Sequence, residues 1–296
     1  MSLKCPYCFK QNPSAESRTF IVHFGSFLRK RDGQSLQRYL CKSCQRTFSS
    51  ASPHPCYRQK KRDLNPVLFQ LFNSGVSQRR LARVLKINRK TVVRKYLFLG
   101  LWAERALELH RSLQEPALEV EFDDLETFEH SKLKPLSVTV AVESKTRRML
   151  GFRVAQMPAK GLLVQKALKK YGVRKDHRKR LREELFKELQ EHIHPKAVIK
   201  SDENPHYPST VRRYFPKATH KTYPGRRGCV VGQGELKAGG YDPLFSLNHS
   251  LAMMRANINR LFRRTWNTTK KKERLSIAVS LYALYHNLEL IKNPST

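Results

Sequence analysis

Four of the six cysteines lie near the N-terminus as two Cys-x-x-Cys pairs, Cys5 with Cys8 and Cys41 with Cys44. Each pair places two thiols on one tight turn, and two such turns supply the four sulfur ligands of a tetrahedral zinc ion. The interval between the pairs exceeds the ~15–20 residues of compact zinc sites, which leaves room for a β-hairpin. We therefore expect these four cysteines to hold one structural Zn²⁺. A redox-active dithiol is the alternative, but the sequence has no βαβ pattern around either pair.

Carboxylates at the ends of apolar strand patterns are the second set of candidate ligands. Asp123 and Asp124 close one such pattern, and Asp202 closes another. If these two strands lie side by side, Asp123 and Asp202 can hold a hard divalent cation such as Mg²⁺ between them. We expect the many cations of the chain to lower the proton affinity of this pair and keep it ionised. The alternative is that each aspartate only caps a turn.

The charge of the whole chain predicts a polyanionic partner. Its 296 residues include 58 Lys and Arg against 24 Asp and Glu, a net charge of +34. DNA or RNA is the expected partner, because neutralised phosphates release their counterions. An anionic membrane surface is a weaker candidate, since the basic residues are spread along the chain. An apolar content of 40% supports a packed core, and no apolar run is long enough to span a membrane.

Three short helical patterns follow a proline- and lysine-bearing linker at residues 51–62. They cover residues 64–74, 78–85 and a basic segment from residue 89, with Ser77 and Asn88 as caps of the second and third. Two short helices, a tight turn and a basic third helix are typical of a helix-turn-helix, whose last helix enters the major groove of DNA. The DNA contacts expected from this helix are Arg89, Lys90, Arg94 and Lys95. An ordinary helical segment with a solvated charged face is the alternative.

The rest of the chain alternates strand and helix patterns. After a helical pattern at residues 97–113, antiparallel strands are expected at residues 118–126, 136–142 and 149–155, with a hairpin turn at 143–148. A short buried strand is expected at Ala197–Lys200, and helices are expected at about residues 161–192, 212–215 and 242–264. This order predicts an α/β layered domain.

The order of these motifs resembles one family over nearly the whole chain. A zinc ribbon, a helix-turn-helix, FDDLETF from Phe122, VIKSD from Val198 and RANINRLFRRTW from Arg255 together resemble zinc-ribbon-bearing insertion-sequence transposases. The resemblance implies a zinc ribbon at residues 1–50, a helix-turn-helix DNA-binding region at 63–113 and a ribonuclease H-like mixed-sheet domain at 117–296. It also implies that Asp123 and Asp202 are the first two catalytic aspartates.

The third catalytic position departs from the pattern of this family. A glutamate is expected about seven residues before the arginine that opens the basic helix, and counting back from Arg255 reaches Asn248. An asparagine offers a metal one carbonyl oxygen but no negative charge. Glu235, in a glycine-rich segment, is the alternative third ligand. The helical register favours Asn248 and the chemistry of a carboxylate favours Glu235; we take Asn248 as the expected third residue.

The activity that the resemblance implies is cleavage and joining of DNA strands by phosphoryl transfer with two Mg²⁺ ions. A basic helix at residues 255–274 is expected to hold scissile phosphates through Arg260, Arg263 and Arg264. His220 is a candidate for moving a proton, and a structural role is the stronger expectation for it.

The implied partners are double-stranded DNA and a second copy of the chain, in the cytoplasm at the nucleoid. Two rival hypotheses stay open. One is a catalytically inactive DNA-binding regulator, which the missing glutamate favours. The other is an RNA-binding zinc-ribbon protein, which a preference for RNA over duplex DNA would indicate.

Overall fold

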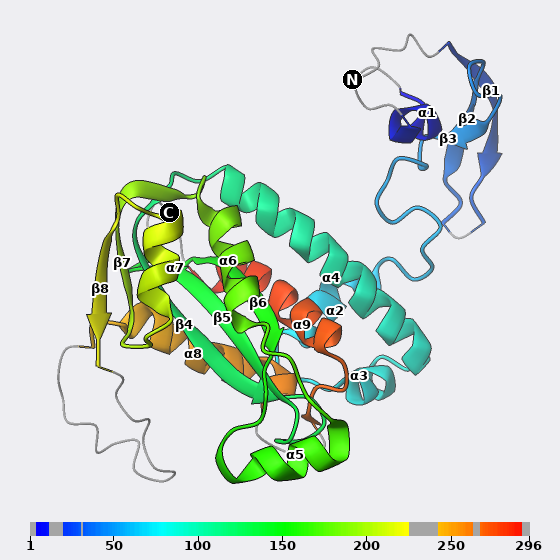
Figure 1. Cartoon of the computed structure of the whole chain (residues 1–296). Helices are drawn as coiled ribbons and strands as arrows, with labels where there is room; N and C mark the ends of the chain where they lie inside the picture. Colours follow the sequence, from blue (N-terminus) through cyan, green and yellow to red (C-terminus); the bar gives the residue numbers. More distant parts are fainter. Residues whose placement is uncertain (1–3, 12–19, 31, 225–241, 263–266, 292–296) are drawn as a thin grey trace. The chain divides into compact units, whose positions relative to one another are not determined.

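The computed structural model describes residues 4–11, 20–30, 32–224, 242–262 and 267–291. The chain divides into two compact units, Met1–Leu64 and Asn65–Thr296, which we call the N-terminal unit and the larger unit (Figure 1). Each unit contains one β-sheet, and the larger one also contains most of the helices, so the expected α/β class is confirmed. Among the described helices, none is long and apolar enough to cross a membrane.

A small antiparallel sheet forms the N-terminal unit. After the helix α1 (Pro6–Gln11), the strands β1 (Ile21–Leu28), β2 (Ser35–Cys41) and β3 (Thr47–Ser49) pair in that order. The interval between the cysteine pairs thus contains the β-hairpin for which its length leaves room. The rings of Tyr39 and Phe48 lie 5.4 Å apart and pack against the cysteines, so this unit builds its core around its thiols.

A five-stranded mixed sheet lies at the centre of the larger unit, in the order β6-β5-β4-β7-β8. The antiparallel strands are β4 (Ala117–Phe128), β5 (Pro135–Glu143) and β6 (Met149–Gln156), as expected. β7 (Ile193–Asp202) runs parallel to β4, and β8 (Thr219–Tyr223) runs parallel to β7. The sequence pattern does not predict β8. β5 is buried over most of its length, as is usual for a strand covered on both faces.

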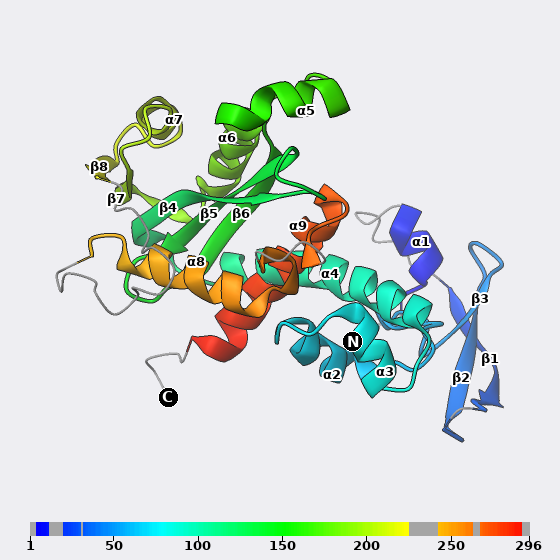
Figure 2. The ribbon, with the colours of Figure 1, turned by 90° about the horizontal axis from the view of Figure 1, so that it is seen from below.

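Helices cover both faces of this sheet, as Figure 2 shows. On one face lie α6 (Arg178–Leu189) and α7 (Tyr207–Tyr214), where the ring of Phe122 on β4 packs against Phe186 and Tyr207. On the other face lie α8 (Phe245–Asn257) and α9 (Lys272–Tyr285), which a π-helical turn at His286–Leu290 follows. Residues that alternate along β4 therefore face either α6 and α7 or α8.

The segment expected to be a helix-turn-helix is helical. It contains α2 (Leu64–Phe72), α3 (Gln78–Val84) and α4 (Arg89–Ser112), and the side chains of Ser77 and Asn88 cap α3 and α4 as expected. α4 is one helix of 24 residues, so the expected short third helix and the helix at residues 97–113 are a single element. Its Gly100 lies against α9, where an added Cβ would collide with Ile277. This close packing explains why α4 and the sheet belong to one unit.

The long charged helix expected at residues 161–192 is broken. A 3₁₀ turn at Gly161–Leu163 leads into α5 (Val164–Tyr171), and α6 begins only at Arg178. Gly172 ends α5 with a φ of +69°, a left-handed conformation that glycine adopts without steric cost.

The basic helix expected at residues 255–274 is not continuous either. α8 ends at Asn257, a 3₁₀ turn covers Asn259–Leu261, and α9 begins at Lys272. The carbonyl oxygen of Asn257 accepts a hydrogen bond from the backbone N–H of Gly75 at 2.8 Å. A backbone N–H from the loop between α2 and α3 thus makes the hydrogen bond that a further turn of α8 would otherwise donate to this carbonyl.

Candidate metal centres and basic surface

The four N-terminal cysteines converge on one point. Their Sγ atoms all lie within 4.8 Å of one another. Cys5 Sγ lies 3.7 Å from Cys44 Sγ, and Cys8 Sγ lies 3.8 Å from Cys41 Sγ. Zn–S bonds of about 2.3 Å give a sulfur tetrahedron whose edges measure about 3.8 Å. The cluster is therefore compatible with the structural zinc site expected from the sequence.

Backbone N–H groups favour the thiolate at one of these cysteines. Burial raises the pKa of Cys41, but hydrogen bonds from the backbone and side chain of Cys44 and from the backbone of Ser43 outweigh it and hold the pKa at about 7. Hydrogen bonding with Cys44, and then burial, raises the pKa of Cys8 to about 12. A metal ion needs all four sulfurs as thiolates, so binding must release protons.

The pairing of β4 with β7 brings Asp123 and Asp202 to the same level of the sheet. The two strands are adjacent and parallel, and their register pairs Glu121 with Lys200. The pairing ends there, and Asp123 and Asp202 each follow two residues later on strands that lie about 4.8 Å apart where they pair. Asp202 lies close enough for its charge to act on the Asp123 carboxyl, which also reaches Tyr207 on α7. The fold thus juxtaposes the two aspartates selected from the sequence.

Asp123 has neutral hydrogen-bond donors and acidic neighbours. Its Oδ1 accepts hydrogen bonds from the Tyr207 hydroxyl at 3.1 Å and from the backbone N–H of Asp124 at 2.6 Å. Burial, together with the charges of Asp202 and Asp124, raises the pKa of Asp123 to about 6.

The expectation that the charge of the chain lowers the proton affinity of this pair is therefore wrong for Asp123, whose pKa lies above its ordinary value. Lost hydration and a nearby carboxylate outweigh lysines and arginines that lie further away. A divalent cation between Asp123 and Asp202 would cancel this repulsion, and carboxylate oxygens are the kind of ligand that a hard cation takes.

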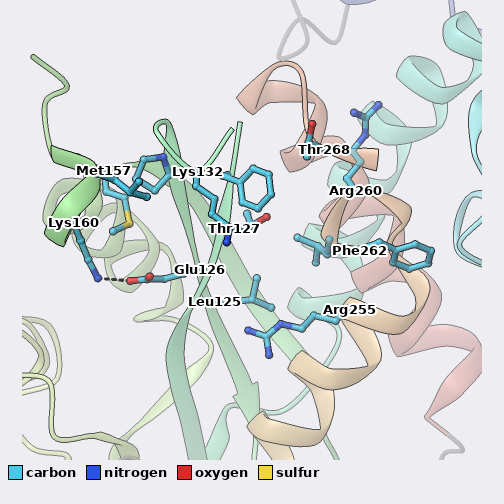
Figure 3. A pocket seen from close by; sticks show the side chains of 14 residues that line it. Leu125, Glu126, Thr127, Lys132, Met157, Lys160, Arg255, Arg260, Phe262 and Thr268 are labelled. Carbon is cyan, nitrogen blue, oxygen red and sulfur yellow. Dashed lines mark hydrogen bonds and ion pairs between the residues drawn. The ribbon is translucent and has the colours of Figure 1, made fainter. Parts of the chain in front are cut away.

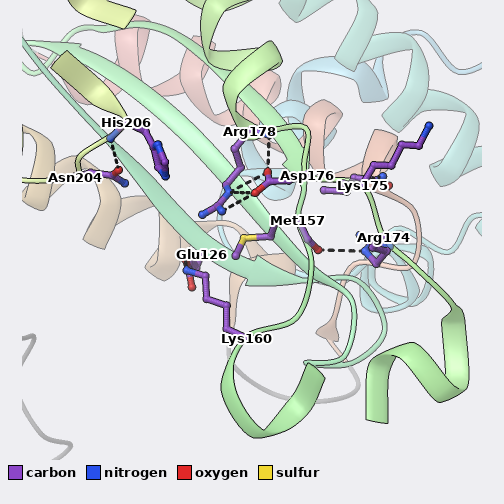
Figure 4. A network of polar contacts seen from close by, with 10 residues as sticks. Glu126, Met157, Lys160, Arg174, Lys175, Asp176, Arg178, Asn204 and His206 are labelled. Carbon is purple, nitrogen blue, oxygen red and sulfur yellow. Dashed lines mark hydrogen bonds and ion pairs between the residues drawn. The ribbon is translucent and has the colours of Figure 1, made fainter. Parts of the chain in front are cut away.

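Asp124 faces the opposite side of β4 and has other partners. Its Oδ1 accepts a hydrogen bond from Thr139 on β5, and its charge acts on Arg178 at the start of α6. Arg178 also binds Asp176, with an Nη2–Oδ2 distance of 2.6 Å, in the polar network of Figure 4. These contacts give Asp124 a structural role and distinguish it from Asp123.

Among the described residues, no third acid joins the aspartate pair at metal-binding distance. Within them, the one group of three or more His, Cys, Asp or Glu side chains at metal-binding distance is the cysteine cluster. Asn248 is exposed on the first turns of α8, and its Nδ2 donates to Asp242 Oδ2 at 3.0 Å. Asp242 also accepts from the backbone N–H of Leu244 at 3.0 Å, so Asn248 takes part in a local hydrogen-bond group before the start of α8. Glu235 lies outside the described residues.

Glu121 is a residue near the site that the sequence analysis does not single out. It is 2% exposed, and its carboxylate accepts hydrogen bonds from Ser144 Oγ and from the backbone N–H of Leu247, both at 2.8 Å. These bonds attach the start of α8 to the strand that carries Asp123. A signal for it exists in the sequence, because Glu119, Glu121 and Asp123 alternate and therefore share one face of β4.

An exposed basic surface covers α3, the turn after it and the start of α4. This α3–α4 basic surface consists of Arg79, Arg80, Arg83, Lys86, Arg89, Lys90 and Arg94. The expectation that Lys95 also contacts DNA is wrong. Lys95 is 2% exposed, and its Nζ donates to Asn65 Oδ1 at 2.7 Å, because the helical period turns it towards α2.

The arginines expected to hold phosphates are described only in part. Arg260 lies in the 3₁₀ turn after α8, with its guanidinium 5.6 Å from the centre of the Tyr96 ring. Arg263 and Arg264 lie outside the described residues.

His220 lies on β8 and contacts Ser201 Oγ at 2.9 Å. Its ring also stacks against Phe122, on the face of the sheet that α6 and α7 cover. These contacts with a hydroxyl and a core ring favour the structural role expected for this histidine.

Comparison with known proteins finds no family model that matches this sequence and no curated protein that is similar to it. The functional argument therefore rests on the residues and their geometry.

Proposed function

We propose that the protein is an insertion-sequence transposase that binds the ends of its element and cleaves and joins DNA at Asp123 and Asp202. The observation that carries this proposal is the proximity of the two aspartates, which lie on the adjacent parallel strands β4 and β7 and of which Asp202 acts on Asp123 through its charge. Their strands belong to a mixed sheet of three antiparallel and two parallel strands, which agrees with the ribonuclease H-like domain that the motif order implies.

The site residues have distinct roles in this proposal. When bound, Mg²⁺ would supply activation of water and stabilisation of the leaving 3′-oxygen, and Asp123 and Asp202 are the residues that would hold it. The Tyr207 hydroxyl orients the Asp123 carboxylate. The backbone N–H of Asn204 donates to Asp202 Oδ1 at 3.1 Å and orients that carboxylate in turn. Glu121 fixes the start of α8, and with it Asn248, to β4.

Duplex DNA is the proposed partner of the α3–α4 basic surface. α3 and α4 are joined by a four-residue turn, residues 85–88, in which Lys86 has a left-handed φ of 49°. Such a turn between a short helix and a basic helix is typical of a helix-turn-helix. The first turns of α4 carry Arg89, Lys90 and Arg94, which can reach phosphates and guanine edges in a major groove. In this proposal the zinc ribbon and a second copy of the chain complete the DNA complex.

The test is nicking of supercoiled plasmid DNA by the full chain in the presence of Mg²⁺. We expect Asp123→Asn and Asp202→Asn to lower the nicking rate at least about 100-fold, because each removes a metal ligand. Asp124→Asn is the matched control, since Asp124 lies on the same strand but faces Thr139 and Arg178. The proposal fails if the two site variants nick as fast as the wild type, or if Asp124→Asn alone abolishes nicking.

A catalytically inactive DNA-binding regulator is the second candidate function. It is favoured by one observation, the absence of a third acid beside the aspartate pair among the described residues. Tight binding of duplex DNA without Mg²⁺- or Mn²⁺-dependent nicking would support this candidate and exclude the first. Preferential binding of RNA would exclude both.

A further inference from the structure

A cavity of about 340 Å³ opens beside the end of β4. Its walls come from the last residues of β4, the loop after that strand, the 3₁₀ turn before α5 and the segment that follows α8 (Figure 3). This volume lies at the lower end of the range for sites that enclose a small organic ligand.

The lining of the cavity combines apolar walls with positive charge. Leu125, Met157 and Leu261 contribute apolar atoms but are almost fully buried, and the part-exposed apolar side chains of the lining are Phe128, Leu163 and Phe262. The cations are Lys132, Arg255, Arg260 and Lys160, and Lys160 is paired with Glu126. Figure 3 shows Lys160 with Glu126 on one side and the two arginines on the other. Such a lining suits a ligand with a flat apolar part and a negatively charged part.

The cavity is adjacent to the aspartate pair along β4. Leu125 lines it and is two residues beyond Asp123, so the two side chains lie on the same face, about 7 Å apart along the strand. A DNA strand whose phosphate reaches Asp123 and Asp202 therefore has its next nucleotide within reach of this cavity.

We infer that the cavity receives one unpaired nucleotide of the bound DNA, beside the phosphate at the aspartate pair. The base lies against Phe128 and Leu163, and its phosphate lies near Lys132 and Arg260. A base pair is too large for this space, so the nucleotide must leave the duplex stack, as bases do in other enzymes that enclose them. This inference rests on the proposed function, because it requires DNA at Asp123 and Asp202.

The experiment compares two fluorescein-labelled DNA duplexes of the same sequence, one of them with a single unpaired 2-aminopurine. Binding to the full chain is followed by fluorescence anisotropy without added Mg²⁺, so that no strand is cut and the zinc is retained. We expect the duplex with the unpaired base to bind about tenfold more tightly, as one stacked base allows. Lys132→Ala, which removes one cavity cation, and Leu163→Trp, which fills the cavity from its rim, should bring this ratio close to one. Arg180→Ala, an exposed arginine on α6, is the control that keeps the ratio.

Each other outcome overturns the inference. Equal affinity for the two duplexes, or a ratio that both cavity variants preserve, would show that the unpaired base is not held here. Competition by free AMP at a concentration that displaces the unpaired duplex would assign the cavity to a free nucleotide instead. Plasmid nicking tests the proposed function separately: active nicking without the preference rejects only the cavity inference, and the preference without nicking rejects only the enzymatic function.

Discussion

The two candidate metal centres of this protein are built in opposite ways. The cysteine cluster draws its four donors from two tight turns, and these donors are also the core of their small unit. The aspartate pair draws its two donors from β4 and β7, which align only after the chain has crossed a hairpin and two helices. The first site depends on local sequence, and the second depends on the complete sheet.

The two centres also differ in what they do to stability. A metal at Cys5, Cys8, Cys41 and Cys44 completes a folded unit and contributes directly to its folding free energy. Asp123 instead has a pKa raised to about 6, so its ionised form is unfavourable in the fold at neutral pH without a cation. The comparison therefore predicts opposite effects on folding. Removing a cysteine should lower the stability of the N-terminal unit, and removing the Asp123 carboxylate should raise the stability of the larger unit without divalent cations.

The largest effect is expected at the cysteine cluster. Cys44→Ser should lower the zinc content from about one ion per chain to nearly none and unfold β1–β3, because structural zinc contributes about 10 kcal/mol or more in small domains. Zinc analysis and amide hydrogen exchange measure the two effects. Cys56→Ser, outside the cluster, should keep both metal and protection. Full zinc content in Cys44→Ser would remove this cysteine from the site.

The second prediction concerns the stability of the larger unit without divalent cations. Asp123→Asn should stabilise it at pH 7 by about 3 kcal/mol, which is the cost of a pKa shift from 3.8 to about 6. The asparagine Oδ1 can still accept from Tyr207 and from the backbone of residue 124. Denaturation in EDTA, followed by the fluorescence of Trp102 and Trp266, measures the difference.

The pH dependence of this difference follows from the sign of the shift. The folded state of the wild type binds more protons than the unfolded state between about pH 4 and pH 6, so its stability falls as the pH rises through that window. The advantage of Asp123→Asn should therefore disappear near pH 4. Addition of Mg²⁺ at pH 7 should stabilise the wild type and leave the variant unchanged. An Asp123→Asn protein that is less stable at pH 7 contradicts the comparison.

The sequence predicts features that depend on near neighbours. The cysteine pairs, the caps Ser77 and Asn88 and the strands β4 to β6 follow from local spacing, and the structure confirms these caps and strands. The two aspartates are recognisable because acids rarely end apolar strands in a chain this basic.

The sequence does not predict features that depend on contacts between residues far apart in the chain. The break after α8 involves a hydrogen bond from Gly75, and the burial of Lys95 involves Asn65 on another helix. The approach of Tyr207 to Asp123 and the resulting balance of burial and charge likewise need the assembled sheet. The hydrophobic periodicity of a strand or a helix, two or 3.6 residues, does not identify such partners.

The third prediction compares two carboxylates on β4, Glu121 and Asp123. Glu121 shares a face of β4 with Asp123, but its carboxylate accepts hydrogen bonds from the Ser144 hydroxyl and the Leu247 backbone N–H. Glu121→Gln should therefore destabilise the larger unit by about 2 kcal/mol, the opposite sign to Asp123→Asn, because one amide oxygen cannot replace two charged acceptors. The same denaturation measurement detects it. Stabilisation by Mg²⁺ should persist in this variant, and its loss would place Glu121 among the metal ligands.

The smallest effect separates the two causes of the raised pKa at Asp123. Asp202→Asn removes the neighbouring charge and leaves Asp123 buried, and burial is the larger cause. The pKa of Asp123 should therefore fall below about 6 and stay well above its ordinary value of 3.8. Carbon-13 NMR titration of the carboxyl groups in EDTA measures it, with Asp123→Asn to identify the signal. A return to 3.8 would show that repulsion between the two carboxylates causes the whole shift. Burial of Asp123 would then not contribute to the difference between the two centres.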